Sequence, residues 1–213
     1  MRKYLIAFAT FASVATLAAS LAPASVIWNE STNGPLSSNQ AAPTPFTFSP
    51  GANSVIGVVK GASKSQCWLE TTIPAGDQLS TVVLNSYSST DSQGFTGFQT
   101  GSSFVGSAFS AGSYTGYTHF GTGATNGSLP PTNLVGDDLL SLMANPALAA
   151  GSTGFTPPLG PGSYTFLIQQ LGASTNFQFD FNITSVPEPT AIGLLVFGPL
   201  LMHRQRRTLA VNH

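Results

Sequence analysis

The side chains that could carry out chemistry are few and widely spaced. His119 is the one histidine outside the C-terminal tail, and no Gly-x-Ser-x-Gly motif is present to expose a serine nucleophile. A general base needs a partner that supplies or accepts its proton, and the sequence offers no such group near His119. The pattern favours a protein without catalytic activity, and a secreted hydrolase is the least favoured alternative.

Acidic residues provide one weak candidate for a metal site. Asp137 and Asp138 are adjacent, and Asp91 begins an Asp-Ser-Gln-Gly sequence that lacks the other acidic ligands of a calcium loop. Solvated turns or a helix cap account better for these carboxylates. We therefore expect no metal and no cofactor, and Asp91, Asp137 and Asp138 are the residues to test for calcium.

The single cysteine, Cys67, excludes both an intramolecular disulfide and a cysteine-based zinc cluster. It follows the same alternation as Leu69 and Ile73, which predicts a buried and unreactive thiol. The alternative is an exposed thiol that pairs with another chain.

Aromatic residues raise a second class of function, binding of carbohydrate. Seven of them occur in a stretch rich in Gly, Ser and Thr: Phe95, Phe98, Phe104, Phe109, Tyr114, Tyr117 and Phe120. Exposed rings can stack on sugar faces, but rings on strands usually belong to the core. A carbohydrate- or calcium-binding module is thus the alternative function.

The placement of charge excludes another class of partner. The chain has 213 residues, of which 7% are charged, and its formal net charge is −1. Residues 25–186 contain Lys60 and Lys64 as their only basic residues against seven acidic ones, a net charge of −5. Such a segment cannot neutralise many phosphates, which argues against nucleic-acid binding.

The middle of the chain has the pattern of an all-β domain. Phe177, Phe179, Phe181 and Ile183 alternate with polar residues, which predicts a half-buried strand. Further strands are expected at 54–60, 66–73, 79–87, 95–99 and 164–169, with less regular ones within 103–109 and 113–120. Many short strands with turn residues between them predict an antiparallel β-sandwich or jelly roll.

Local signals predict two further features. Gly172-Ala173-Ser174 is interpreted as the turn of a hairpin between the last two strands. One helix is expected within 137–149, with Leu139, Leu140 and Met143 facing inward and Pro146 limiting its length. The Pro-rich segment 25–45 is expected to form a polar leader or an edge segment.

Two segments of this domain resemble a known module. The sequence Gly162-Ser-Tyr-Thr-Phe leads into a Gln-rich strand, and Ile-Pro-Ala-Gly-Asp occupies 73–77. Both are similar to PPC-type domains, the bacterial pre-peptidase C-terminal modules, and the resemblance implies a β-sandwich. The region from about 100 to 158 does not align with that pattern.

The N-terminus has the three parts of a secretory signal peptide. A basic start, Arg2 and Lys3, precedes an uncharged run rich in Ala, Leu and Phe. Ala22 and Ala24 then stand at the −3 and −1 positions of a cut after Ala24. Export through the Sec translocon and cleavage by signal peptidase are expected, and a retained membrane anchor is the alternative.

The C-terminus has its own three-part order. Val186, Pro187, Glu188 and Pro189 precede an uncharged run from Thr190 to Met202, and a basic cluster follows with Arg204, Arg206 and Arg207. This arrangement resembles the PEP-CTERM sorting signal of exported bacterial proteins. The resemblance implies recognition of the Pro-Glu-Pro motif by an exosortase, a membrane protease, in bacteria that make exopolysaccharide.

The physical properties of this segment fit such a role. The apolar run can enter the membrane transiently as a hydrophobic sorting helix, and the arginines orient it by the positive-inside rule. The run has 13 residues, which is short for the hydrocarbon core, so snorkelling and local thinning must cover the gap. A buried core helix followed by a basic tail is the alternative.

The sequence therefore predicts an exported, non-enzymatic cell-surface or extracellular-matrix protein that associates with exopolysaccharide in a biofilm. Its expected parts are a signal peptide (1–24), a polar leader (25–45), a β-sandwich (46–185), a sorting signal (186–207) and a tail (208–213).

Overall fold

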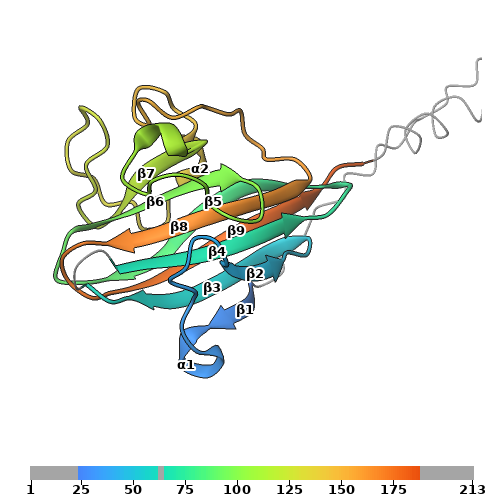
Figure 1. The fold of residues 1–213 in the computed structure, drawn as a ribbon, viewed down its shortest axis with the longest axis horizontal. Helices are drawn as coiled ribbons and strands as arrows, with labels where there is room; N and C mark the ends of the chain where they lie inside the picture. Colours follow the sequence, from blue (N-terminus) through green and yellow to red (C-terminus); the bar gives the residue numbers. More distant parts are fainter. Residues whose placement is uncertain (1–23, 62–64, 188–213) are drawn as a thin grey trace, which may run out of the picture.

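The computed structural model describes residues 24–61 and 65–187, which fold into two β-sheets (Figure 1). The four-stranded sheet has the spatial order β1 (Ser25–Asn29), β3 (Gly51–Val59), β9 (Thr175–Ser185) and β5 (Asp77–Ser88). The five-stranded sheet has the order β2 (Thr44–Thr47), β4 (Ser65–Ile73), β8 (Gly162–Gln170), β6 (Gln93–Thr100) and β7 (Gly116–Gly121). The prediction of an all-β fold is confirmed.

The expectation of purely antiparallel pairing was wrong at one edge of each sheet. β1 pairs in parallel with β3, and β2 pairs in parallel with β4. Parallel neighbours need a long crossover connection, and the chain supplies one because it alternates between the sheets from β1 to β6. Segment 25–45 thus contributes β1 and the start of β2, both of them edge strands.

The predicted hairpin between the last two strands was also wrong. β8 pairs with β4 and β6, whereas β9 pairs with β3 and β5, so residues 171–174 connect one sheet to the other. Each strand has one strongly apolar face. Because β8 and β9 lie in opposite sheets, their apolar faces pack against each other and both are buried. If the two strands were paired in one sheet, their apolar faces would point the same way and another layer would have to cover them.

The two sheets share one core that is rich in Phe. Phe179 of β9 contacts Phe120 of β7 with ring centroids 5.1 Å apart, and Phe181 of β9 contacts Phe166 of β8 at 5.4 Å. Both pairs are edge-to-face, the favoured geometry for aromatic rings. The alternation predicted for 177–183 is confirmed, because the apolar members of that strand are all buried.

Helical structure is limited to short pieces among the described residues: α1 (Glu30–Asn33), a 3-10 turn (Ala111–Ser113) and α2 (Leu139–Met143). Leu139, Leu140 and Met143 of α2 are buried, as predicted. The helix ends at Met143, earlier than expected. Asn145 directly precedes Pro146, and the proline ring sterically disfavours the helical conformation at the residue before it. None of these described helices has the length and apolar character needed to cross a membrane.

A loop covers part of the outer face of the five-stranded sheet. Phe104, Ala108 and Tyr114 from segment 101–115 pack on Trp68 of β4 and Leu167 of β8. We call these five residues the outer cluster. The strand expected within 103–109 is absent from this segment of the described chain. The loop instead forms a second small core on the side of the sheet that faces away from the first.

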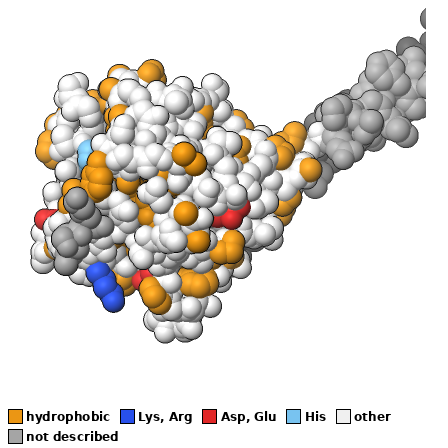
Figure 2. All heavy atoms as spheres, in the orientation of Figure 1, with side chains coloured by type: hydrophobic (Ala, Val, Ile, Leu, Met, Phe, Trp, Pro, Cys, Tyr) orange, Lys and Arg blue, Asp and Glu red, His pale blue; other side chains and the backbone are white. Residues whose placement is uncertain are grey.

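Charged side chains are sparse on the face drawn in Figure 2, where uncharged polar side chains and backbone dominate and apolar atoms are scattered. The first strand of the described residues, β1, starts immediately after Ala24, and Val186 after β9 donates its backbone N–H to the Gly76 carbonyl oxygen at 2.7 Å. Ala22, Glu188, Pro189, the run from Thr190 to Met202, and Arg204, Arg206 and Arg207 lie outside the described residues.

Candidate functional site

Three neighbouring strands of the five-stranded sheet place a row of side chains on its outer face. Phe95 of β6 is in register with His119 of β7 on one side and with Gln169 of β8 on the other. Residues directly opposite each other in antiparallel strands point to the same face. Their chain neighbours Phe120 and Ile168 belong to the main core, so the row faces outward.

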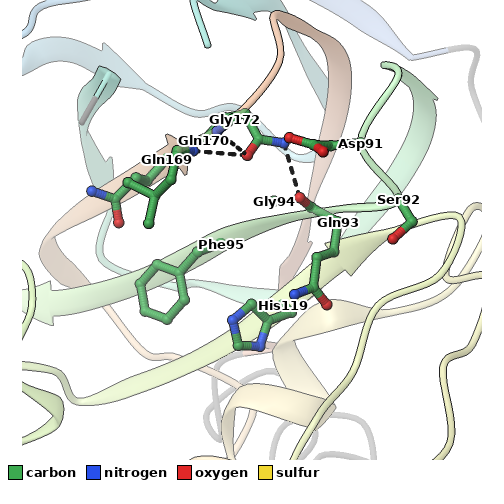
Figure 3. Close-up of a pocket in the computed structure, with 10 residues that line it drawn as sticks. Asp91, Ser92, Gln93, Gly94, Phe95, His119, Gln169, Gln170 and Gly172 are labelled. Carbon is green, nitrogen blue, oxygen red and sulfur yellow. Dashed lines mark hydrogen bonds between the residues drawn. The ribbon is translucent and has the colours of Figure 1, made fainter. Parts of the chain in front are cut away.

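The row lies between two adjoining hollows that share Phe95, His119, Gln169 and Leu171. Figure 3 shows the first of them, the polar hollow, with Phe95, His119 and Gln169 in its lining. The polar hollow has a volume of about 340 Å³ and is also lined by Asp91, Ser92, Gln93, Gly94, Gln170 and Gly172. The aromatic hollow has a volume of about 300 Å³ and is also lined by Ala108, Phe109, Ala111, Tyr114 and Tyr117. Each volume is at the lower end of the range for small-molecule sites.

Two consecutive glutamines of β8 have opposite roles at this site. Gln170 lies on the same face of β8 as Ile168, which points into the main core. Its side chain makes four hydrogen bonds, to Gln93, Leu171, Gly172 and Thr175. Gln169 is 4% exposed, yet its Nε2 has no hydrogen-bond partner among the described residues. A buried amide donor without a partner is costly, and Trp28 Nε1 and Trp68 Nε1 share this state, but of these three donors only Gln169 lines the hollows.

The backbone beside His119 is held by a buried amide. Asn126 Oδ1 accepts hydrogen bonds from the His119 backbone N–H at 2.7 Å and from Thr118 Oγ1 at 2.9 Å. Burial lowers the pKa of the His119 imidazole from its ordinary value of 6.5, opposed by hydrogen bonding to the Thr125 backbone and to Asn126. The imidazole is therefore mostly neutral at pH 7, with one donor and one acceptor nitrogen, and it already hydrogen-bonds to the Thr125 backbone and to Asn126.

Phe95 is the centre of an aromatic group. Its ring centroid lies 5.4 Å from that of Tyr114, 5.6 Å from that of Tyr117 and 5.6 Å from the imidazole of His119. Phe109 and Leu171, which are 56% and 57% exposed, line the aromatic hollow as well. An apolar, ring-lined surface thus reaches solvent beside the polar groups of Gln169 and His119.

Asp91 fixes one wall of the polar hollow. Its Oδ2 accepts a hydrogen bond from the Ala173 backbone N–H at 2.7 Å, and its carbonyl oxygen accepts one from the Tyr87 hydroxyl at 2.8 Å. A Cβ atom at Gly172 would overlap the Asp91 carboxylate, so this close approach requires glycine there. Asp91 therefore holds the loop between β8 and β9 against the loop between β5 and β6.

The weak candidates for calcium are engaged separately. Asp138 caps α2 through the backbone N–H groups of Leu140 and Ser141, whereas Asp137 is exposed. No group of three or more His, Cys, Asp or Glu side chains suited to a metal occurs within 24–61 and 65–187. Asp91 belongs to the polar hollow and is not brought into such a group with the other two.

Cys67 is buried in the main core, as predicted, with 6% of its surface exposed. Burial raises the pKa of its thiol to about 12, and the nearby negative charge of Glu30 adds to the effect. Because the thiolate is the reactive form, this thiol is inert at neutral pH in the folded chain.

Of the sorting motif, the structure describes Val186 and Pro187, both exposed just after β9. Ala24 is exposed just before β1.

The aromatic residues proposed for sugar binding separate into two groups. Phe98, Phe104, Tyr114 and Phe120 are buried, whereas Phe95, Phe109 and Tyr117 are at least partly exposed at the aromatic hollow.

Sequence reasoning missed Gln169 as a site residue. The alternation of 164–169 does place it on the face opposite to that of Phe166 and Ile168, and hence on the outer face of the sheet.

No family model, no curated protein and no solved structure matches this chain.

Proposed function

We propose that this chain is an exported, non-enzymatic protein of the cell surface or extracellular matrix, processed at both ends and sorted by an exosortase-type enzyme. The supporting observation is the position of the folded part between the two candidate processing segments. β1 begins at Ser25, directly after the proposed cut, and β9 ends at Ser185, directly before the sorting motif.

Removing both segments would leave the sheets complete. Within the part of the chain that the structure describes, the backbone hydrogen bond nearest the C-terminal end is the one from Val186 to Gly76 at 2.7 Å, and Pro187 follows it exposed. Proteases need extended, accessible backbone, and prolines on both sides of Glu188 disfavour a helix there. The motif thus directly follows the fold and can reach an enzyme in the membrane.

Each part of the proposed signal has its own role. Pro187, Glu188 and Pro189 serve recognition, and the run from Thr190 to Met202 holds the chain transiently in the membrane. Arg204, Arg206 and Arg207 keep the extreme end on the cytoplasmic side. The released domain then associates with the extracellular polysaccharide of a biofilm.

The test is to fractionate cells of the natural host and determine the mature termini by mass spectrometry. Wild-type protein should start at Ser25 and lack the C-terminal arginine cluster, Arg204, Arg206 and Arg207. Glu188→Ala should remain in the membrane fraction with its tail intact, whereas Glu70→Ala, which removes a carboxylate within the fold, should be processed normally. Normal processing of Glu188→Ala would overturn the proposed sorting.

A further inference from the structure

We propose that the polar and aromatic hollows form one binding cleft for a neutral oligosaccharide, with at least two consecutive sugar rings in contact with Phe95, His119 and Gln169. This inference names a ligand class and a site for the polysaccharide association proposed above, and only the natural source of the glycan rests on that proposal. Binding by the purified chain does not depend on export or processing.

The charge of the cleft selects an uncharged ligand. Within the described ranges, neither hollow is lined by a Lys or an Arg, so nothing there would pair with a phosphate, sulfate or uronate. Asp91 is the acidic residue in the lining, and its Oδ2 is engaged by the Ala173 N–H. The net charge of −5 over 25–186 would also repel a polyanion.

The rings of the aromatic hollow match one side of a sugar. A pyranose ring has a face of C–H groups and a rim of hydroxyls, so it packs against an aromatic surface while its edge makes hydrogen bonds. Phe95 is partly exposed in the middle of the row, with Tyr117 beside it at 5.6 Å. An apolar wall with a few convergent polar groups is the usual character of such a site.

Gln169 provides the polar group that the ligand would satisfy. Its side chain lines both hollows, and its Nε2 lacks a hydrogen-bond partner within the described chain. The terminal torsion of a glutamine is soft, so a small rotation can turn the amide toward a bound hydroxyl. A hydroxyl that accepts from this nitrogen would remove the cost of leaving it unpaired.

The neighbouring glutamine shows why Gln169 is the informative residue. Gln170 lines the polar hollow too, but both of its amide atoms are committed to the fold by four hydrogen bonds. The neutral imidazole of His119 is in register with Phe95, opposite Gln169. Polar side chains therefore stand on both sides of the central ring, and the Gln169 amide is the one whose nitrogen has no partner within the described chain.

The continuity of the two hollows sets the minimum length of the ligand. They share Phe95, His119, Gln169 and Leu171, so a chain lying across this row contacts both. One ring would lie against the aromatic wall, and the next would place its hydroxyls in the polar hollow. A single monosaccharide would fill only one of the two and bind more weakly.

The experiment measures binding by the full chain, purified in a detergent without a sugar headgroup, by isothermal titration calorimetry. The probes are hexasaccharides of glucose, mannose, galactose and N-acetylglucosamine, with hexagalacturonate as the anionic comparison. At least one neutral probe should bind, more tightly than its monosaccharide and more tightly than hexagalacturonate. Absence of binding by all four neutral probes, or tighter binding of the anionic one, would overturn the proposal.

Variants locate the site. Gln169→Ala and Phe95→Ala should each weaken binding by about tenfold or more, because each removes one principal contact. Gln78→Ala, which removes an amide from the other sheet, should leave the affinity within about twofold of wild type. If Phe95→Ala does not fold, the Gln169→Ala result decides, and an affinity unchanged by Gln169→Ala refutes this site even if a sugar binds elsewhere.

Success or failure here is separable from the processing proposal. A chain that binds no neutral oligosaccharide can still show the Glu188→Ala defect in cells. Conversely, normal processing of Glu188→Ala has no effect on calorimetry with purified protein.

Discussion

The carboxylate of Asp138 accepts a hydrogen bond from the backbone N–H of Val82 at 3.0 Å while the same oxygen caps α2 through the N–H of Leu140 at 3.0 Å. One side chain thus joins the start of the helix to the edge strand β5. This position explains why a residue that the sequence offered as a weak calcium ligand is committed to the fold.

Replacing Asp138 tests this contact between α2 and β5. Asp138→Ala should lower the free energy of unfolding by about 2 kcal/mol, because a helix cap and the partner of a strand N–H are lost together. Asp137→Ala makes the same change in charge at an exposed neighbour and should cost less than about 0.5 kcal/mol. Urea denaturation of both variants measures these changes. Equal losses of unfolding free energy would show that the effect comes from removing a negative charge and not from losing the helix cap.

Packing of the shared core is tested at Phe181. This ring is 1% exposed and contacts Phe48 and Phe166 with centroids 4.8 Å and 5.4 Å away. Phe181→Ala should destabilise the fold by about 3–5 kcal/mol, since the sheets cannot collapse fully into the space left behind. Val105→Ala, at a side chain that is 70% exposed, is the control and should change stability little.

The buried thiol of Cys67 predicts a folding-dependent reactivity. With a pKa raised to about 12, little thiolate forms at about pH 8, so iodoacetamide should modify the native chain very slowly. The same reagent should label the chain rapidly in concentrated urea. Mass spectrometry follows the added mass, and rapid labelling of the native protein would show that Cys67 is accessible.

Stability should depend on pH through His119. Its pKa is lowered in the folded state, so as pH falls below about 6.5 the unfolded chain binds a proton that the folded chain resists. The free energy of unfolding should therefore decrease between about pH 7.5 and 5.5, and less steeply in His119→Gln. The two pH profiles are compared by urea denaturation, and parallel profiles would assign the effect to other groups.

Alternation of apolar residues predicted the strands well, because burial on one face is a local property of the sequence. Phe177 and Phe179 in β9 and Phe166 in β8 all face the core as expected. The partners of these strands were not predictable in the same way. Whether a short connection turns back within a sheet or passes to the opposite one depends on which apolar faces must cover each other.

Segment 103–109 shows a second limit. Its strand pattern is overridden by the side chain of Gln99, whose Oε1 accepts from the Val105 N–H at 2.8 Å and whose Nε2 donates to the Val105 carbonyl oxygen at 3.1 Å. Gly101 and Gly106 adopt positive φ values of 116° and 102°, which break an extended run. A side-chain amide that replaces a strand partner leaves no periodic signal in the sequence.

The cleft was accessible to sequence reasoning only in part. Composition identified the aromatic stretch, but ring type does not distinguish the buried Phe104 from the partly exposed Phe95. That distinction arises because the loop packs over Trp68 and Leu167, which lie outside the row, and leaves Phe95 partly exposed. The unpaired Gln169 amide likewise depends on which groups the loop brings near it.

The central position of β9 has a mechanical consequence. Any pull on the chain beyond Pro187 enters the fold through this strand, which is hydrogen-bonded along its length to β3 on one side and β5 on the other. Those bonds run across the strand, so a force along its axis shears them together instead of opening them one at a time. A domain held by its C-terminal end against flow would therefore bear load through its most strongly paired strand.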